Sequence, residues 1–345
     1  MAVTRRQLLA LPIWAGTAVG CASVGRRMSA GGGGGYVELA TSGPAAAPTT
    51  ILVAMPDTPQ TRQVWTGLGD ELGKQYRLVA VRVDGAGAAD VFAEAIRRHH
   101  PAGIVLMNNP TVAAYRSYQR AMGGDRFPPA VIVMTSFLTG QVTHVLCATG
   151  ISYEVPLITV VTNLRKLIAS PLERIGVVVR SAQRAFVAGQ AALARREQIS
   201  VIEQEVSAEP NPSELKWALR RLKGNVDAIW ILNDDRLLTP RLIAEGWLPG
   251  LSERPFCPTI VGAASLVSAR QPFGTFAVLP DHVALGAQAA ELVFDIADQS
   301  WAIAPDAQVL LPLSTTTAVD LAQARAHFSL REDALRQVDR IVEQD

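Results

Sequence analysis

Short apolar runs alternate with helical patterns along the first half of the chain. The apolar runs are rich in branched residues, and the segments between them place apolar side chains three or four residues apart, as Val64, Leu68 and Leu72 do. The predicted elements are the strands 49–56, 76–83, 103–108 and 130–135, the short extended segment 144–150, and the helices 60–74, 89–98 and 111–122. Near-continuous apolar strands separated by helices indicate a parallel sheet covered on both faces.

The same alternation restarts after residue 150. The second block consists of the helices 156–168, 183–196, 213–222 and 236–246 and the strands 174–180, 200–206, 227–232 and 258–263. A third block consists of the strands 274–280 and 308–314, the helices 281–298 and 319–326, and a C-terminal amphipathic helix carrying Leu330, Ala334, Val338 and Ile341 on one face. The pattern predicts an α/β protein with two doubly wound, Rossmann-like lobes and a hinge. Such sheets bind ligands beyond the carboxyl ends of their strands, and two facing lobes close by a hinge motion.

The N-terminus has the pattern of an export signal. Arg5 and Arg6 precede an apolar run of 13 residues from Leu8 to Gly20. A membrane-spanning helix needs about 20 apolar residues, so the run fits a cleaved signal peptide over residues 1–20. Small residues before Cys21 resemble the lipobox of bacterial lipoproteins, in which the cysteine is lipidated. An ordinary signal in which Cys21 is incidental is the alternative.

The segment that follows has the composition of a flexible tether. Residues 22–49 contain the five consecutive glycines 31–35 and are otherwise rich in Ser, Thr, Ala and Pro. Such a stretch has too little apolar surface to fold, and it spans roughly 30 Å on average. We therefore expect residues 21–49 to hold a globular body away from a membrane through a lipid anchor.

Composition and charge exclude several classes of function. The net charge of +1 leaves no basic field for nucleic acid, so we expect no nucleic-acid partner. Cys147 and Cys257 lie in apolar runs and are predicted to be buried thiols, although a disulfide between them stays open. The chain has no GxSxG, HExxH or CxxC motif. We therefore predict a protein that is not an enzyme and that has no cofactor and no metal site.

Polar residues follow several predicted strands, where a ligand site is expected. Asn233, Asp234 and Asp235 come after the strand 227–232, and their carboxylates could accept hydrogen bonds from a ligand ammonium group. Asn108 has the same position after the strand 103–108, and Ser136 follows the strand 130–135. Asn and Asp are also favoured helix N-caps, so helix capping is the competing interpretation.

Five stretches resemble the substrate-binding proteins of ABC transporters with the type I periplasmic-binding fold, in the tryptophan-binding-like lipoprotein branch. They are the TGIS of 149–152, the segment 164–178 with LERIGV, the DAIW of 227–230 leading to NDD, the ASLV of 264–267, and the LGAQAA of 285–290. Each motif is short, and their order along residues 50–320 carries the resemblance.

The resemblance implies two lobes joined by three crossovers. Residues 50–151 and 273–302 would form lobe 1, and residues 152–272 and 303–345 would form lobe 2, with the segment from Gly274 returning to the first lobe. Family positions carried over to this sequence imply five ligand-binding residues, which are Asn108, Ser136, Asp234, Ser265 and Asp281.

The implied function is capture of a small, amino-acid-like organic ligand in a cleft between the lobes for an ABC importer. The implied partners are the ligand, an ABC permease in the inner membrane, and a membrane reached through the lipid anchor. The implied location is the periplasm. Ala22 resembles an outer-membrane sorting signal, while an inner-membrane anchor stays open. Because the loops after the first and fourth strands depart from the family pattern, the alternative is a binding-protein fold that acts as an envelope scaffold or regulator.

Overall fold

The structure is a computed structural model that describes residues 35–83, 87–268, 273–304 and 307–343. The expected signal peptide, Cys21 and Ala22 lie outside the described residues, so signal cleavage and lipidation stay predictions. No helix within the described ranges has both the length and the apolar character required to cross a bilayer.

The first sheet has six strands in the order β1-β3-β2-β4-β5-β6. Its strands are β1 (Glu38–Ser42), β2 (Thr50–Met55), β3 (Arg77–Arg82), β4 (Gly103–Met107), β5 (Ala130–Val133) and β6 (Ala148–Gly150). All neighbouring pairs are parallel except β1 with β3, which are antiparallel. The apolar runs predicted from the sequence form this sheet, and most of their residues are buried because helices cover both faces.

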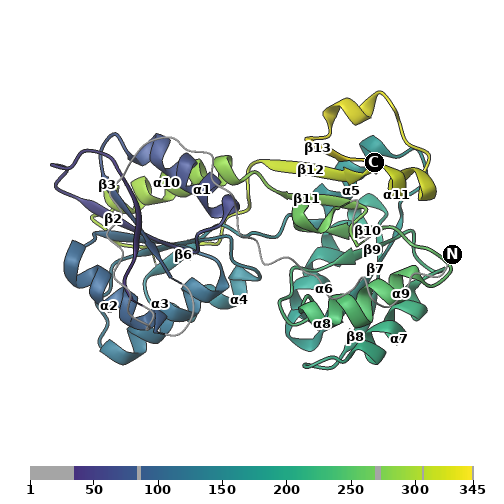
Figure 1. Cartoon of the computed structure of the whole chain (residues 1–345), viewed down its shortest axis with the longest axis horizontal. Helices are drawn as coiled ribbons and strands as arrows, with labels where there is room; N and C mark the ends of the chain where they lie inside the picture. The colour runs from purple at the N-terminus through teal and green to yellow at the C-terminus, as the bar shows by residue number, and fades with distance from the viewer. Residues whose placement is uncertain (1–34, 84–86, 269–272, 305–306, 344–345) are drawn as a thin grey trace. The chain divides into compact units, whose positions relative to one another are not determined.

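Figure 1 shows α1 and α10 on one face of the first sheet and α2, α3 and α4 on the other. The helices are α1 (Pro59–Leu72), α2 (Ala88–His99), α3 (Asn109–Met122), α4 (Leu138–Val142) and α10 (His282–Asp298). Alternate residues of each strand enter two separate cores. Ile51 and Val53 pack under α1 and α10, while Leu52 and Ala54 pack with Phe92 from α2.

The helices α1 and α10 approach each other closely at two glycines. A Cβ atom on Gly67 would lie 2.0 Å from the carbonyl oxygen of Val283, and one on Gly286 would lie 2.2 Å from the carbonyl oxygen of Val64. Neither position has room for a side chain, so the two glycines set the distance between these helices.

The second sheet has seven strands in the order β13-β12-β11-β10-β9-β7-β8. Its strands are β7 (Arg174–Arg180), β8 (Ser200–Val206), β9 (Ala228–Ile231), β10 (Thr259–Val261), β11 (Phe276–Pro280), β12 (Thr315–Asp320) and β13 (Arg340–Val342). All neighbouring pairs are parallel except β11 with β12.

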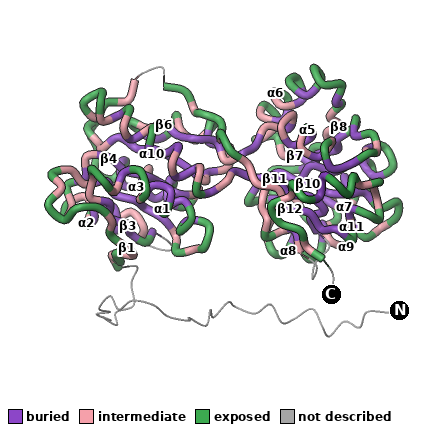
Figure 2. Tube along the Cα trace, turned by 90° about the horizontal axis from the view of Figure 1, so that it is seen from above, coloured by how far each residue is buried: buried purple, intermediate pink, exposed green. Residues whose placement is uncertain are grey.

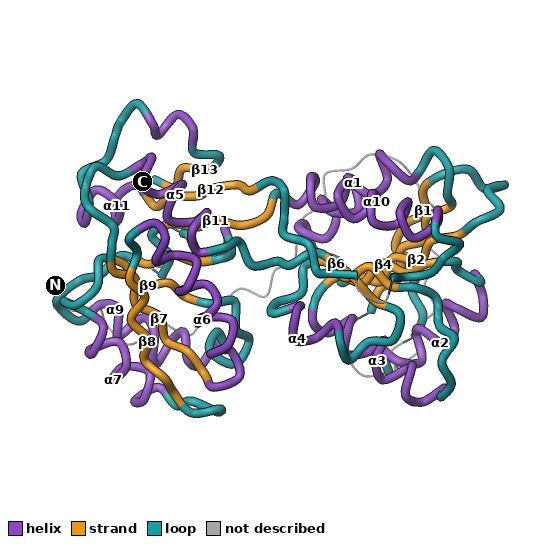
Figure 3. Tube along the Cα trace, turned by 180° about the vertical axis from the view of Figure 1, so that it is seen from behind, coloured by secondary structure: helices purple, strands orange, loops and turns teal. Residues whose placement is uncertain are grey.

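The central strands β7, β9, β10 and β11 of the second sheet are mostly buried, and helices flank this sheet as well (Figures 2 and 3). They are α5 (Leu157–Leu167), α6 (Arg184–Ala194), α7 (Pro212–Leu222), α8 (Pro240–Leu242), α9 (Leu248–Ser252) and α11 (Leu321–His327), with a π-helical turn at Ile243–Trp247. The side chains of α5 and α6 share a core with Trp230, whereas those of α7 share a core with Trp247. The predicted class, two α/β sheets each covered by helices, is therefore confirmed.

The strand β11 corrects the expected crossover. We expected the segment from Gly274 to return to the first lobe, but β11 pairs with β10 and β12 in the second sheet. After β11 the chain crosses to the first sheet, where α10 packs on α1. The run of apolar residues at 274–280 is consistent with either sheet, so its partner could not be predicted from its pattern.

Other segments also differ from the prediction. Residues 38–42 lie in the expected tether but form β1, which adds an antiparallel edge to β3. Residues 308–314 form only an isolated bridge, in which Leu310 pairs with Ile151, and the strand β12 begins at Thr315. The predicted C-terminal helix is absent from the described residues, where a 3₁₀ turn at Ala334–Gln337 leads into β13.

Candidate functional site

Asn108 and Asn109 connect the ends of β4 and β5. Asn108 is the N-cap of α3, and its Oδ1 accepts a hydrogen bond from the backbone N–H of Thr111 at 3.0 Å. Asn109 Oδ1 accepts the backbone N–H of Ser136 at 2.9 Å. The carbonyl oxygen of Ser136 accepts Nε2 of Gln141 at 2.6 Å. These contacts give Asn108 the capping role that competed with ligand binding, and they fix the loop that carries Ser136.

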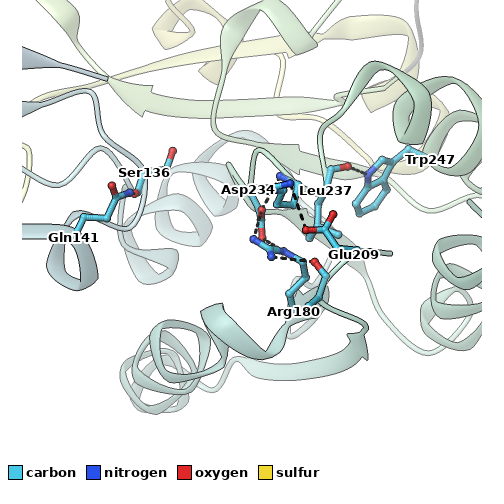
Figure 4. A network of polar contacts seen from close by, with 9 residues as sticks. Ser136, Gln141, Arg180, Glu209, Asp234, Leu237 and Trp247 are labelled. Atoms are coloured by element: carbon cyan, nitrogen blue, oxygen red, sulfur yellow. Dashed lines mark hydrogen bonds and ion pairs between the residues drawn. The ribbon is translucent and has the colours of Figure 1, made fainter. Parts of the chain in front are cut away.

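Asp234 forms a buried ion pair with Arg180 (Figure 4). Nε and Nη2 of Arg180 donate to the two carboxylate oxygens at 2.8 Å each, and the backbone N–H of Arg236 donates to Oδ1 at 2.9 Å. Only 1% of Asp234 is exposed. The hydrogen bonds that Arg180 donates to Asp234 raise the pKa of Arg180 against the effect of burial. The carboxylate predicted to meet a ligand is thus satisfied by protein groups.

The two remaining predicted residues differ in environment. Asp281 is the N-cap of α10, where its Oδ1 accepts the backbone N–H groups of Val283 and Ala284 at 2.9 and 3.2 Å. Ser265 is exposed in a 3₁₀ turn after β10. No hydrogen bond or ion pair joins any two of the five predicted site residues in the described part of the chain. Their role in ligand binding stays a prediction.

A cavity of about 440 Å³ brings together segments that the sequence does not connect. One part of its wall comes from α4 and its N-cap and from the segment after β6, and the other part comes from α6 and the turn before it. The lining residues are Phe137, Leu138, Thr139, Gly140, Ser152, Glu154, Ala182, Ala185, Phe186, Gly189 and Gln190. The rings of Phe137 and Phe186 meet edge to face, with centroids 5.3 Å apart. The volume lies in the range of small-molecule sites.

Glu154 is the ionisable residue of this cavity. Its Oε1 accepts the backbone N–H of Phe137 at 2.9 Å, and its Oε2 accepts the hydroxyl of Ser152 at 3.1 Å. Burial raises the pKa of the Glu154 carboxyl, and the hydrogen bonds from Phe137 and Ser152 oppose that effect. Glu154 also lines a second cavity of about 20 Å³ with Trp230 and Asn233, which has room for a single water molecule.

Tyr153, the neighbour of Glu154, is linked to α10 and through it to α1, the two helices on one face of the first sheet. The hydroxyl of Tyr153 lies 2.9 Å from Nε2 of His282 at the start of α10, and Nδ1 of His282 lies 3.1 Å from Oε1 of Gln63 in α1. The rings of Tyr153 and His282 are stacked, with an interplanar angle of 8°. Burial lowers the pKa of His282. These contacts hold the segment that positions Glu154.

Glu154 and Phe186 were not predicted as site residues from the sequence. The TGIS motif ends at Ser152, two residues before Glu154, and Phe137 directly follows the predicted Ser136. The sequence signal that could have indicated Glu154 is its position directly before the apolar Val155 in a connecting segment, because charged residues are seldom buried. Nothing in the sequence places Phe186 of α6 near them.

Residues able to hold a metal are not grouped anywhere in the described ranges. Cys147 and Cys257 are free thiols. Cys257 is buried as predicted, and burial raises its pKa to about 12. Cys147 is exposed, which corrects the prediction, because it lies in a turn with left-handed backbone (φ +54°) before β6 rather than within the strand.

No protein-family model matches the chain, and no curated protein matches it by sequence. Solved structures match its fold. A ligand-free, open substrate-binding protein with adhesive properties from Clostridium difficile superposes with a TM-score of 0.59 at 13% identity, over 86% of this chain and 99% of the other.

Two further structures agree with that match. An ABC domain in complex with L-Trp from Streptococcus pneumonia gives a TM-score of 0.55 at 15% identity, over 85% of this chain and 100% of that one. A conserved domain protein from Vibrio cholerae gives a TM-score of 0.55 at 17% identity, over 86% of this chain and 99% of that one. The chain therefore has the fold of type I periplasmic binding proteins, as the resemblance implied.

Proposed function

We propose that this chain is an extracytoplasmic solute-binding protein that captures a small, amino-acid-like organic ligand for an ABC importer. The cavity of about 440 Å³ carries the proposal, because segments of both halves of the chain line it and because it combines two phenylalanine rings with one buried carboxyl. Apolar walls with a few polar groups are typical of small-molecule sites. The ligand-bound and ligand-free forms of the structural neighbours support the same role.

The proposed site differs in part from the one implied by the resemblance. Glu154, Phe137 and Phe186 form its wall, while Ser136 lies next to Phe137 in the same loop. Asn108 and Asp281 cap helices, and Asp234 orders the end of β9 through Arg180. We propose that residues 50–151 with α10 form one lobe and that the second sheet with its helices forms the other.

The location is proposed from the N-terminal residues. Arg5, Arg6 and the apolar run before Cys21 indicate export, lipidation of Cys21 and a periplasmic lipid anchor. Mass spectrometry of the N-terminus of the protein isolated from cells tests this, since a chain that begins at a lipidated Cys21 is expected. An unmodified chain that starts at another residue would contradict the proposed lipid anchor.

Thermal unfolding in the presence of amino acids, amines, small organic acids, purines and sugars tests the binding role. A ligand that binds only the folded state raises the stability by about 2.7 kcal/mol at a hundredfold excess over its dissociation constant. We expect compounds of one chemical class to raise the unfolding temperature. A folded protein that responds to no class would contradict solute binding and favour the envelope-scaffold alternative.

A further inference from the structure

Glu154 is a buried carboxyl that has no cationic partner among the residues that the structure describes. Only 8% of the residue is exposed, and its two hydrogen-bond donors, the Phe137 amide and the Ser152 hydroxyl, are both uncharged. The ion pairs of the described residues do not include Glu154, whereas the even more deeply buried Asp234 is paired with Arg180. A buried carboxylate is costly unless a cation compensates it.

The cavity beside Glu154 also lacks positive charge. None of its lining residues is Lys, Arg or His. Two of the other polar groups of the wall are engaged, since Oε1 of Gln190 accepts the backbone N–H of Leu157 at 2.9 Å and the Ser152 hydroxyl donates to Glu154. A ligand carboxylate would therefore meet no cationic side chain, while a ligand cation would meet an uncompensated acid.

The aromatic walls define the rest of the ligand. Phe137 and Phe186 are both half-buried, and Phe186 also contacts Trp230, whose ring centroid is 6.0 Å away. Aromatic faces favour apolar groups and also attract organic cations. The wall thus offers one acid and an apolar aromatic surface.

We propose that Glu154 binds the cationic group of the ligand, and that the ligand class is an aromatic or apolar amine for which a carboxylate is not required. This inference rests on the proposed function and narrows it, because an amino acid would bind through its ammonium group alone. Binding of the amine supplies the counter-charge that the folded protein lacks at Glu154.

Calorimetry with matched ligands tests the inference. For the wild-type protein, 2-phenylethylamine and tryptamine are compared with 2-phenylethanol and tryptophol, which replace the ammonium by a hydroxyl, and with phenylalanine and tryptophan, which add a carboxylate. The amines should bind at least about 30-fold more tightly than the alcohols, the loss expected when one partner of a buried charge pair is removed. They should also bind at least as tightly as the amino acids. This comparison needs no variant.

Glu154→Gln keeps the shape of the side chain and removes its charge, so it should abolish the preference for amine over alcohol. Glu197→Gln, at an exposed glutamate outside the cavity, is the matched control and should keep the preference. Amine binding that is unaffected by Glu154→Gln, or amino acids that bind more tightly than amines, would overturn this inference and leave solute binding intact. If neither these probes nor any compound of the thermal-unfolding panel binds, both this inference and the proposed solute-binding function would be overturned.

Discussion

The ion pair between Arg180 and Asp234 indicates that Asp234 stabilises the fold rather than binding a ligand, and its contribution to stability can be measured. The side chains are 12% and 1% exposed, and the pair is bidentate at 2.8 Å. Asp234→Ala removes the carboxylate and leaves a mostly buried guanidinium without its partner. Loss of one member of a buried pair costs about 3–5 kcal/mol, a large part of the roughly 5–15 kcal/mol that stabilises a typical domain.

Urea unfolding followed by circular dichroism measures this loss. We expect Asp234→Ala to lower the free energy of unfolding by about 3 kcal/mol or more. Replacing both partners by apolar residues, as in Arg180→Met with Asp234→Leu, should recover part of it, because no charge is then left buried. Asp235→Ala, at an exposed carboxylate next in the chain, is the control and should stay within about 0.5 kcal/mol of wild type. A loss below about 1 kcal/mol for Asp234→Ala would refute the reasoning and return Asp234 to the ligand-binding role.

Other substitutions and measurements test the close helix contact, the buried acid and the two thiols. Gly286→Ala should destabilise the protein by about 1–3 kcal/mol in urea unfolding, because its Cβ would lie 2.2 Å from a backbone oxygen, whereas Gly69→Ala, whose Cβ would be 3.6 Å from its nearest neighbour, should be neutral or stabilising. Equal effects at the two glycines would contradict the close contact. Because burial raises the pKa of Glu154 above its usual 4.5, its protonated form favours folding. The free energy of unfolding should therefore fall as the pH rises through that raised value, and Glu154→Gln should flatten the fall; an identical pH profile would argue against it. Of the two thiols, a maleimide should modify exposed Cys147 in the native protein and reach Cys257 only after unfolding, which peptide mass spectrometry would show.

The strands and their helices could be predicted because the pattern of each element is local. A parallel strand such as β4, buried along its whole length, requires an apolar run, and a helix such as α1 requires one apolar face. The strand β1 was missed because its sequence, ELATS, is polar and follows a run of glycines; pairing with β3 makes it a strand. The C-terminal segment was misread because Leu330, Ala334 and Val338 do face one core, but as turns packed on it rather than as a helix.

The candidate site could be predicted only in part. A sequence shows which polar residues follow a strand, but it does not show which groups their side chains contact in the fold. The sequence indicated Asn108 and Asp234 as polar residues after strands, yet their role depends on Thr111 and Arg180, which bind their side chains in the fold. Glu154 is a candidate ligand-binding residue because it is buried beside a cavity that segments from both halves of the chain line. Such an environment arises only in the folded protein.

Hydrogen exchange with and without the best ligand of the thermal-unfolding panel tests the central claim most directly. If this chain binds its solute in the cavity, the ligand should slow exchange both in residues 137–140 with Glu154 and in residues 182–190, because these segments form its wall. Protection confined to another region, such as the cavity between Phe256 and His327, would contradict the account.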